Sequence, residues 1–278
     1  MTVSGKAWRA ERKPQLAYSA IQGKMHDEAG RIQKARKILK VLHHYLGRDD
    51  LAGLRALDIG ASTGFIAAEL AGDGAMTTGI DIDEPGIMAA RARVGDAVEL
   101  LVESADAMPF PDESFDIVVL NHIYEHVVDA DAVVREIHRV LKVGGVAYLG
   151  LANRYQLMEP HYRLPLLSWL PQRAADVYIR RAGKAEEYYE KHLSRRNLKT
   201  LVRGFHVYDY TIPVIGRPDL FGSDDQVPGA VARLPARVVS ALLPIVPTYI
   251  WIATKTSGAP RGVPVDGLAH LDLTGVVR

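Results

Sequence analysis

The stretch Leu57–Phe65, LDIGASTGF, places glycines at positions 60 and 64 with only small residues between them. One interpretation is an ordinary turn after a buried strand, where glycine relieves steric strain at positive φ. The other is a loop whose missing side chains let a ligand lie against the backbone at a helix N-terminus. Ser62 stands where the G-x-G-x-x-G pattern of nicotinamide and flavin binders requires its second glycine. A nicotinamide oxidoreductase is therefore disfavoured.

Apolar segments on both sides of this stretch alternate between strand and helix patterns. Seven short apolar runs predict strands, at residues 54–59, 76–81, 97–102, 114–121, 144–151, 205–212 and 248–255. Helical spacing is found at residues 24–46, 63–71, 84–93, 129–141 and 194–204. Strands that alternate with helices indicate an α/β protein, in which a mostly parallel sheet has helices on both faces.

The alternation is interrupted after the fifth predicted strand. The segment that follows is rich in proline, aromatic residues and arginine, and its polar stretch AEEYYEKH predicts a helix. A final segment that contains glycine and proline lacks periodicity and is expected to be flexible. These observations divide the chain into an N-terminal helical cap (1–48), a core (49–152), an insertion (153–193), the remainder of the core sheet (194–256) and a flexible tail (257–278).

Composition excludes several kinds of chemistry. The chain has no cysteine, which excludes disulfides, thiolate metal sites and cysteine nucleophiles. No apolar run reaches the roughly 18 residues of a membrane span, and no signal-peptide core is recognisable, so we expect a cytoplasmic location. Lys and Arg outnumber Asp and Glu by 12 to 5 in residues 1–56 and by 11 to 5 in residues 151–203, whereas residues 57–150 carry 5 against 17. The basic flanks are either solvated helix faces or a rim that attracts an anionic substrate or surface.

Four segments in one order carry a family resemblance: LDIGASTG (57–64), GIDID (79–83), ADAMPFPDESFDIVV (105–119) and EIHRVLKVGGVAYL (136–149). With these segments the chain resembles the class I S-adenosylmethionine-dependent methyltransferases of the type 11 group. Its layout after the fifth strand, beginning with ANRYQ, resembles the ubiquinone-biosynthesis O-methyltransferases. The resemblance implies a Rossmann-like fold with a seven-stranded, mostly parallel sheet, and S-adenosyl-L-methionine as the cofactor.

The same resemblance implies a role for each motif residue. Gly60 and Gly64 would let the backbone approach the methionine part of the cofactor, and Asp81 would bind the ribose hydroxyls. Asp106 would accept a hydrogen bond from the adenine amino group, and Asn121 would lie beneath the sulfonium. The implied cofactor-binding residues are Asp58, Gly60, Ala61, Ser62, Gly64, Asp81, Ile82, Asp106, Ala107 and Asn121.

Methyl transfer from a sulfonium depends mainly on positioning and on a deprotonated acceptor. Histidine is the natural base for a hydroxyl acceptor, and the stretch NHIYEHVVD supplies His122 and His126 as candidate catalytic residues. Alternatively, Glu125 and His126 only hold this loop to the following helix. The three residues could also bind a divalent ion, but close neighbours in sequence need not converge, so we expect no metal.

The insertion supplies the candidate substrate-binding residues His161, Tyr162 and Trp169. Pro165 and Pro171 bracket LLSWL and prevent one long helix. We therefore expect a lid that buries Trp169 and Leu167 over the acceptor. The alternative is a weak membrane-surface contact through residues 153–184, with arginines near anionic headgroups.

These features predict O-methylation of a small-molecule or lipid-linked acceptor. The alternatives are N- or C-methylation of a natural product or sugar, and a cofactor-binding protein without turnover. Nucleic acid is not an expected partner, because the chain lacks an N/D-P-P-Y/F tetrapeptide after the fourth strand. Its aromatic residues also do not interleave with basic ones as in RNA-binding proteins.

Overall fold

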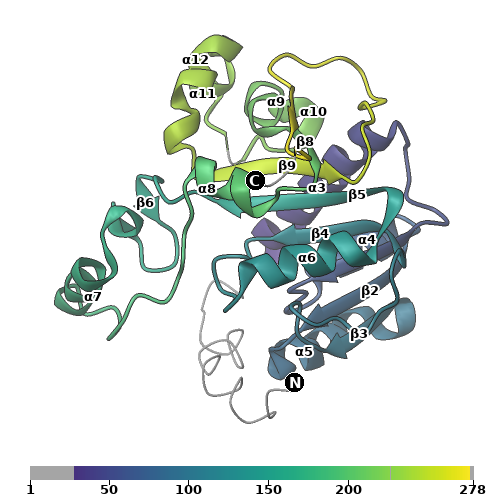
Figure 1. The fold of residues 1–278 in the computed structure, drawn as a ribbon, viewed down its shortest axis with the longest axis horizontal. Coiled ribbons are helices and arrows are strands. Elements are labelled where there is room, and N and C mark those ends of the chain that lie inside the picture. The colour runs from purple at the N-terminus through teal and green to yellow at the C-terminus, as the bar shows by residue number, and fades with distance from the viewer. Residues whose placement is uncertain (1–27, 226, 276–278) are drawn as a thin grey trace.

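A sheet of eight strands forms the centre of the molecule in a computed structural model that describes residues 28–225 and 227–275 (Figure 1). The strand order is β10-β8-β9-β5-β4-β1-β2-β3. The strands are β1 (Arg55–Ile59), β2 (Met76–Asp81), β3 (Val98–Val102), β4 (Phe115–Asn121), β5 (Leu141–Ala152), β8 (His206–Asp209), β9 (Thr248–Thr254) and β10 (Ala269–Asp272). Strands β1 to β5 are mutually parallel, and β9 and β10 pair antiparallel with their neighbours. The sheet is therefore mostly parallel, as the sequence predicts.

Helices cover both faces of the sheet because the central strands are apolar on both sides. One face packs against α6 (Ala130–Val140) and α8 (Arg195–Leu201). The other face packs against α3 (Glu28–Leu46), α4 (Phe65–Gly72), α5 (Glu84–Val94), α9 (Thr211–Gly216) and α10 (Pro218–Phe221). The remaining helical segments are η2 (Gly95–Ala97), η3 (Leu167–Trp169), α7 (Gln172–Arg181), α11 (Gly229–Ala232), α12 (Ala236–Leu242) and η4 (Leu243–Ile245). None of the helices within the described residues combines the length and apolar character needed to cross a membrane.

The register of the parallel strands places the loops after β1, β2 and β4 side by side. Strand β1 lies between β2 and β4, with Ile59 opposite Ile80 on one side and Leu120 on the other. These strands are parallel, so the residues that follow them meet at one edge of the sheet. In open α/β sheets this carboxyl edge is where ligands bind.

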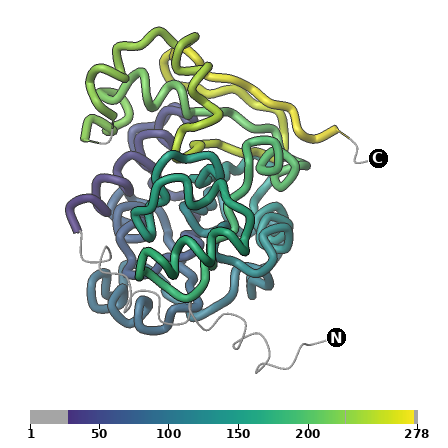
Figure 2. The backbone as a smooth tube through the Cα atoms, turned by 90° about the vertical axis from the view of Figure 1, so that its left-hand side faces the viewer, coloured from purple at the N-terminus to yellow at the C-terminus, as the bar shows by residue number. Residues whose placement is uncertain are grey.

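The insertion also lies at this edge and is closed on itself (Figures 1 and 2). Its first and last residues, Asn153 and Leu193, form a parallel bridge, and it contains the two-stranded β6–β7 ribbon (Met158–Glu159 and Leu164–Pro165). It has a small core of its own, made of Leu167, Ala175, Ile179 and Tyr188. The insertion is therefore a compact unit rather than an open loop.

Two expectations for the C-terminal half are wrong. The sheet has eight strands rather than seven, because residues 269–272 of the predicted tail form β10 and pair antiparallel with the edge strand β8. The stretch AEEYYEKH is not a helix. Its backbone bonds to α7 instead, where Asp176 accepts from the Tyr188 amide and Gln172 donates to the Tyr188 carbonyl. Tertiary partners thus replace the helical hydrogen bonds.

Tyr124 ties the insertion to the sheet, and its removal tests how much this tie contributes. Its buried hydroxyl donates to the Ala152 carbonyl at the end of β5 and accepts from the Leu193 amide. Tyr124→Phe would leave both backbone groups without this partner, and we expect the free energy of unfolding to fall by about 1–3 kcal/mol. Denaturant unfolding measures this, with Tyr189→Phe, whose side chain is 52% exposed, as the control. Equal stability of the two variants would contradict the assignment.

Candidate functional site

The turn after β1 comes close to the backbone and side chains around it. The amides of Gly60 and Ala61 both donate to the Ile80 carbonyl, at 2.8 and 3.0 Å. Gly60 has φ +77°, and a Cβ there would lie 2.1 Å from the Ile123 side chain. Only glycine satisfies both the conformation and the space at this position.

A shallow cavity, about 390 Å³ including its open mouth, lies beside this turn at the carboxyl edge of β1, β2 and β3. It is lined by Ile59, Gly60, Ile80, Asp81, Ile82, Glu103, Ser104, Ala105, Asp106, Ile123, Val127 and Val133. Four of the predicted cofactor residues, Gly60, Asp81, Ile82 and Asp106, are therefore brought together. Sequence reasoning missed the apolar wall from Ile123 to Val133, because those residues are typical of any buried loop and helix.

Asp81 holds the two loops that border the cavity. Its carboxylate accepts from the Ser62 amide at 2.8 Å and from the Asp83 amide at 2.9 Å. Burial raises the pKa of Asp81 to about 6, and these two amides only partly offset it. Asp83 caps α5 by accepting from the Gly86 amide, as expected of a helix N-cap.

Asp58 is a buried carboxylate whose oxygens have no hydrogen-bond partner of ordinary geometry among the described residues. Burial and the nearby Asp81 charge raise its pKa to about 7, and the Ala67 amide and Arg31 charge offset this only partly. The Ser62 hydroxyl is likewise buried without such a partner in the described part of the chain. Polar atoms left unsatisfied around a glycine turn suit a polar, partly cationic ligand.

Two of the predicted cofactor residues also take part in packing. Gly64 lets α4 approach α5, because a Cβ there would lie 2.8 Å from the Ala90 side chain. Ala61 packs in the small core between these helices. Ala107 is not among the residues that line the cavity, whereas Ala105 is.

A second cavity, about 710 Å³ including its open mouth, lies beyond the ends of β4 and β5. It is lined by Lys34, Lys37, Asn121, His122, Tyr148, Gln156, Met158, Pro160, Pro247, Thr248 and Ile250. Consecutive residues of one loop thus face different cavities: His122 lines this one, and Ile123 lines the first. The insertion supplies a wall of the second cavity, and α3 supplies two lysines.

Asn121 and His122 stand at the border of the two cavities. The Asn121 side chain lies over Gly150, where a Cβ would come 2.1 Å from its Oδ1 atom. His122 has φ +57°, a strained conformation for a non-glycine residue. Its Nδ1 lies 3.4 Å from the buried Glu125 carboxylate, and its Nε2 lies 3.4 Å from the Thr248 hydroxyl. The strained backbone therefore holds this imidazole against the cavity.

Glu125 and His126 differ in charge and in position. Burial alone would raise the pKa of Glu125, but contact with His122 outweighs this and lowers it to about 2. Burial lowers the pKa of His126 to about 4. His126 does not line the second cavity and packs edge-on against His161, with ring centroids 4.9 Å apart. Of the two candidate bases, His122 is the one that faces the cavity.

The three predicted substrate residues lie beside the cavity rather than on its wall. His161 and Tyr162 are held by the buried Glu159, which pairs with the His161 Nδ1 at 2.6 Å and accepts from the Tyr162 amide at 2.8 Å. Trp169 donates to the Gln156 carbonyl and is 37% exposed. Leu167 is buried in the insertion's own core, and neither it nor Trp169 is among the residues that line the second cavity.

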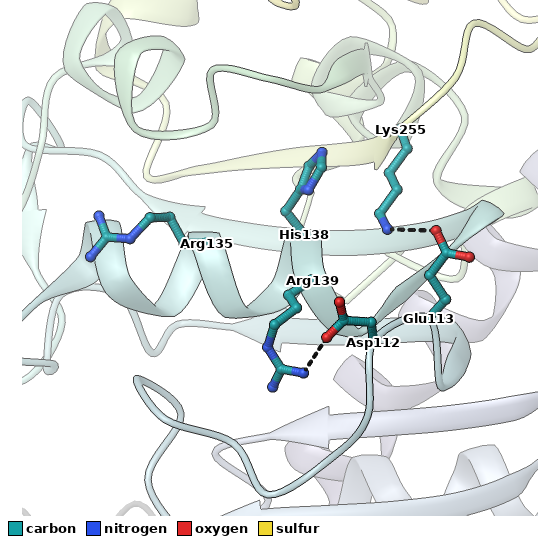
Figure 3. Close-up of a pocket in the computed structure, with 6 residues that line it drawn as sticks. All are labelled: Asp112, Glu113, Arg135, His138, Arg139 and Lys255. Atoms are coloured by element: carbon teal, nitrogen blue, oxygen red, sulfur yellow. Dashed lines mark hydrogen bonds and ion pairs between the residues drawn. The ribbon is translucent and has the colours of Figure 1, made fainter.

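A third hollow, shown in Figure 3, is not a candidate site. It lies at the start of β4 and the end of β9, which is the amino edge of the parallel strands. Its charges pair with each other, Arg139 with Asp112 at 2.9 Å and Lys255 with Glu113 at 3.4 Å. The ligand-binding edge is the opposite one.

Comparison with known proteins agrees with this geometry. Residues 57–149 match the model of a methyltransferase domain family. Over 175 residues the chain is 30% identical to the ubiquinone/menaquinone biosynthesis C-methyltransferase UbiE of Shewanella frigidimarina, covering 57% of this chain and 69% of that protein. The chain belongs to the S-adenosylmethionine-dependent methyltransferases. It is also 31% identical over 142 residues to a ubiquinone biosynthesis O-methyltransferase of Chelativorans, a match that covers 46% of this chain and 55% of that protein.

A solved structure, the PH0226 protein of Pyrococcus horikoshii, shares the fold of this methyltransferase. Its TM-score is 0.56 at 16% identity, with 86% of this chain and 98% of that chain covered. The family model includes every residue that lines the first cavity but ends before the insertion. S-adenosylmethionine is therefore the cofactor of this methyltransferase. The buried polar atoms of Asp58 and Ser62 fit a ligand with an amino group and hydroxyls.

Asp81 provides a direct test of the cofactor site. Asp81→Asn would remove a charge-assisted acceptor for the ribose hydroxyls, and we expect the Kd for S-adenosylmethionine to rise at least about tenfold. In the unmodified protein the Kd should also rise as pH falls below about 6, because Asp81 then takes up a proton. Titration calorimetry measures both effects, with the exposed Asp96→Asn as the control. A Kd equal to that of the control would mean that the ribose is held elsewhere.

Asp58 is expected to destabilise the cofactor-free protein at neutral pH. Its folded pKa of about 7 lies above the unfolded value, so its contribution is absent below about pH 4 and grows as pH rises to 7. Asp58→Asn should therefore raise the free energy of unfolding by roughly 2–4 kcal/mol at pH 8 and hardly at all at pH 4. Denaturant unfolding at the two pH values measures this. A gain of equal size at both pH values would contradict it.

Proposed function

We propose that this methyltransferase transfers a methyl group to a hydroxyl oxygen of a small, negatively charged acceptor, with His122 as the general base. The observation that carries the proposal is the loop 121–123, whose neighbouring residues line the two cavities. An acceptor in the second cavity would thus lie next to the cofactor with only this loop between them. Relatives named as ubiquinone-pathway O- and C-methyltransferases support a small-molecule acceptor.

Glu125 and His122 form the pair that would handle the proton. The buried Glu125 anion faces Nδ1 of His122, which favours the tautomer with a proton on Nδ1 and a free lone pair on Nε2. Nε2 would accept the proton of the acceptor hydroxyl, and Glu125 would stabilise the resulting imidazolium. S-adenosylmethionine, when bound, supplies a methyl group on a sulfonium that is already a good leaving group. The chain therefore needs to supply orientation and one base.

Lys34 and Lys37 support an anionic acceptor. Both line the second cavity, and no acidic side chain of the described residues does. Burial and the Lys34 charge lower the pKa of Lys37 to about 8, with Asp225 opposing the shift. A carboxylate or phosphate on the acceptor would offset the cost of placing two ammonium groups beside one cavity. This fits the excess of basic residues in the first 56 positions.

A lipid-linked acceptor is the second candidate, and exposed apolar side chains on the insertion favour it. Leu157, Met158, Leu166 and Trp169 are each between 37% and 56% exposed, and Met158 also lines the cavity. Such a surface suits weak contact with a membrane that holds the acceptor. Assays with a short-chain and a long-chain acceptor of the same head group distinguish the two candidates.

Replacing the base tests the mechanism. We expect His122→Gln and Glu125→Gln to lower kcat by about 10²–10⁴-fold and about 10-fold or more, respectively, while the Kd for S-adenosylmethionine stays nearly unchanged. Lys37→Met should instead raise the acceptor KM with a smaller effect on kcat. Steady-state assays on hydroxylated aromatic acids supply these values, with His138→Gln as the control. Full activity of His122→Gln would exclude it as the base, and methylation at carbon would favour the C-methyltransferase alternative.

A further inference from the structure

Three segments that are distant in sequence bring metal-binding side chains together beside the second cavity. His126 comes from the loop after β4, His161 from the turn between β6 and β7, and Glu190 from the segment before α8. Each offers one ligand atom, and these atoms all lie within 4.8 Å of one another. From the sequence alone, only the neighbours 122, 125 and 126 stand out as possible ligands, because nothing in the sequence links His126 to the insertion.

His161 is oriented as metal-bound histidines usually are. Its Nδ1 pairs with Glu159 at 2.6 Å, and Glu159 is fully buried and fixed by the Tyr162 amide. The Nε2 atom is therefore the one left to face His126 and Glu190. A carboxylate that holds one nitrogen of an imidazole while the other binds the ion is the common outer-shell arrangement at metal sites.

Glu190 supplies an independent sign that a cation belongs here. Its side chain is 94% buried, and its Oε2 atom has no hydrogen-bond partner among the described residues. A buried carboxylate oxygen without a partner costs free energy unless a proton or a cation meets it.

A second set, Glu159, His161 and His192, has a similar spacing but is already satisfied. The two ring nitrogens of His192 are engaged by Gln156 at 3.2 Å and by the Tyr188 hydroxyl at 2.8 Å. Glu159 has both of its oxygens engaged as well. An ion at this second set would have to displace these hydrogen bonds, so the first set is favoured.

We propose that His126, His161 and Glu190 bind one divalent transition-metal ion, with Glu159 as the outer-shell partner of His161. Two imidazoles and one carboxylate are a donor set that zinc accepts while keeping a further position open, and Fe²⁺ and Mn²⁺ also use it. The ion would join the insertion to the loop that carries His122. It would thereby fix the wall of the second cavity, independently of whether the acceptor is methylated at oxygen.

The test is metal binding by the full chain, measured without any methyl acceptor. The protein is stripped with a chelator, titrated with Zn²⁺ by calorimetry and with Co²⁺ by visible absorption, and its melting temperature is recorded with and without Zn²⁺. We expect one ion per chain, and a Kd at least about tenfold higher for His161→Ala and Glu190→Gln. Glu159→Gln should raise the Kd by about 10–100-fold, as outer-shell variants do.

Control variants separate this site from its alternatives. His192→Gln should leave the Kd within about twofold, and His138→Gln and Glu113→Gln, at the opposite edge of the sheet, should leave it unchanged. Zn²⁺ should raise the melting temperature of the unmodified protein but not that of Glu190→Gln. The proposal is overturned if Zn²⁺ binds the unmodified protein no more tightly than it binds Glu190→Gln. It is also overturned if His192→Gln, and not Glu190→Gln, abolishes binding.

Discussion

The parallel pairing of β1 between β2 and β4 is the constraint on which the rest of the molecule depends. With Ile59 in register with Ile80 and Leu120, the chain must leave all three strands at the same edge of the sheet. The pairing of these strands therefore suffices to bring together the glycine turn, the Asp81 carboxylate and the loop 121–123. A shift of one residue in β1 would turn Asp58 toward the opposite face of the sheet.

The same edge of the sheet carries two aspartate carboxylates that are wholly or partly shielded from solvent, Asp58 and Asp81. Asp58 is buried and Asp81 is partly buried near it, and both have raised pKa values. Packing of the apolar sheet and helices around them offsets the unfavourable free energy of burying these carboxylates. A ligand with an amino group and ribose hydroxyls would meet the same two carboxylates, and the groups that weaken the empty protein would then be those that favour binding. This is a common relation between stability and function at buried sites.

The insertion adds a compact unit beside the carboxyl edge of the sheet. It closes on itself through the bridge between Asn153 and Leu193, and Tyr124 ties it to the end of β5. It then supplies one wall of the second cavity and most of the histidine and glutamate cluster. The match to the methyltransferase family model ends at residue 149, before the insertion begins.

The sequence by itself predicted a mostly parallel sheet with helices on both faces, because that arrangement depends on local periodicity. Short motifs such as LDIGASTG carry the family resemblance that implied the cofactor. The same resemblance implied Gly60, Asp81, Ile82 and Asp106 as cofactor-binding residues, and the structure places all four on one cavity. Only the tertiary structure decided that Gly64 serves helix packing, that AEEYYEKH is not a helix, and that residues 269–272 add a strand. It alone set His122 apart from His126 and brought His126 to His161 and Glu190. Contacts between segments distant in the chain produce no periodic pattern in the sequence, because the conformation of each such segment depends on its tertiary partner and not on its sequence neighbours.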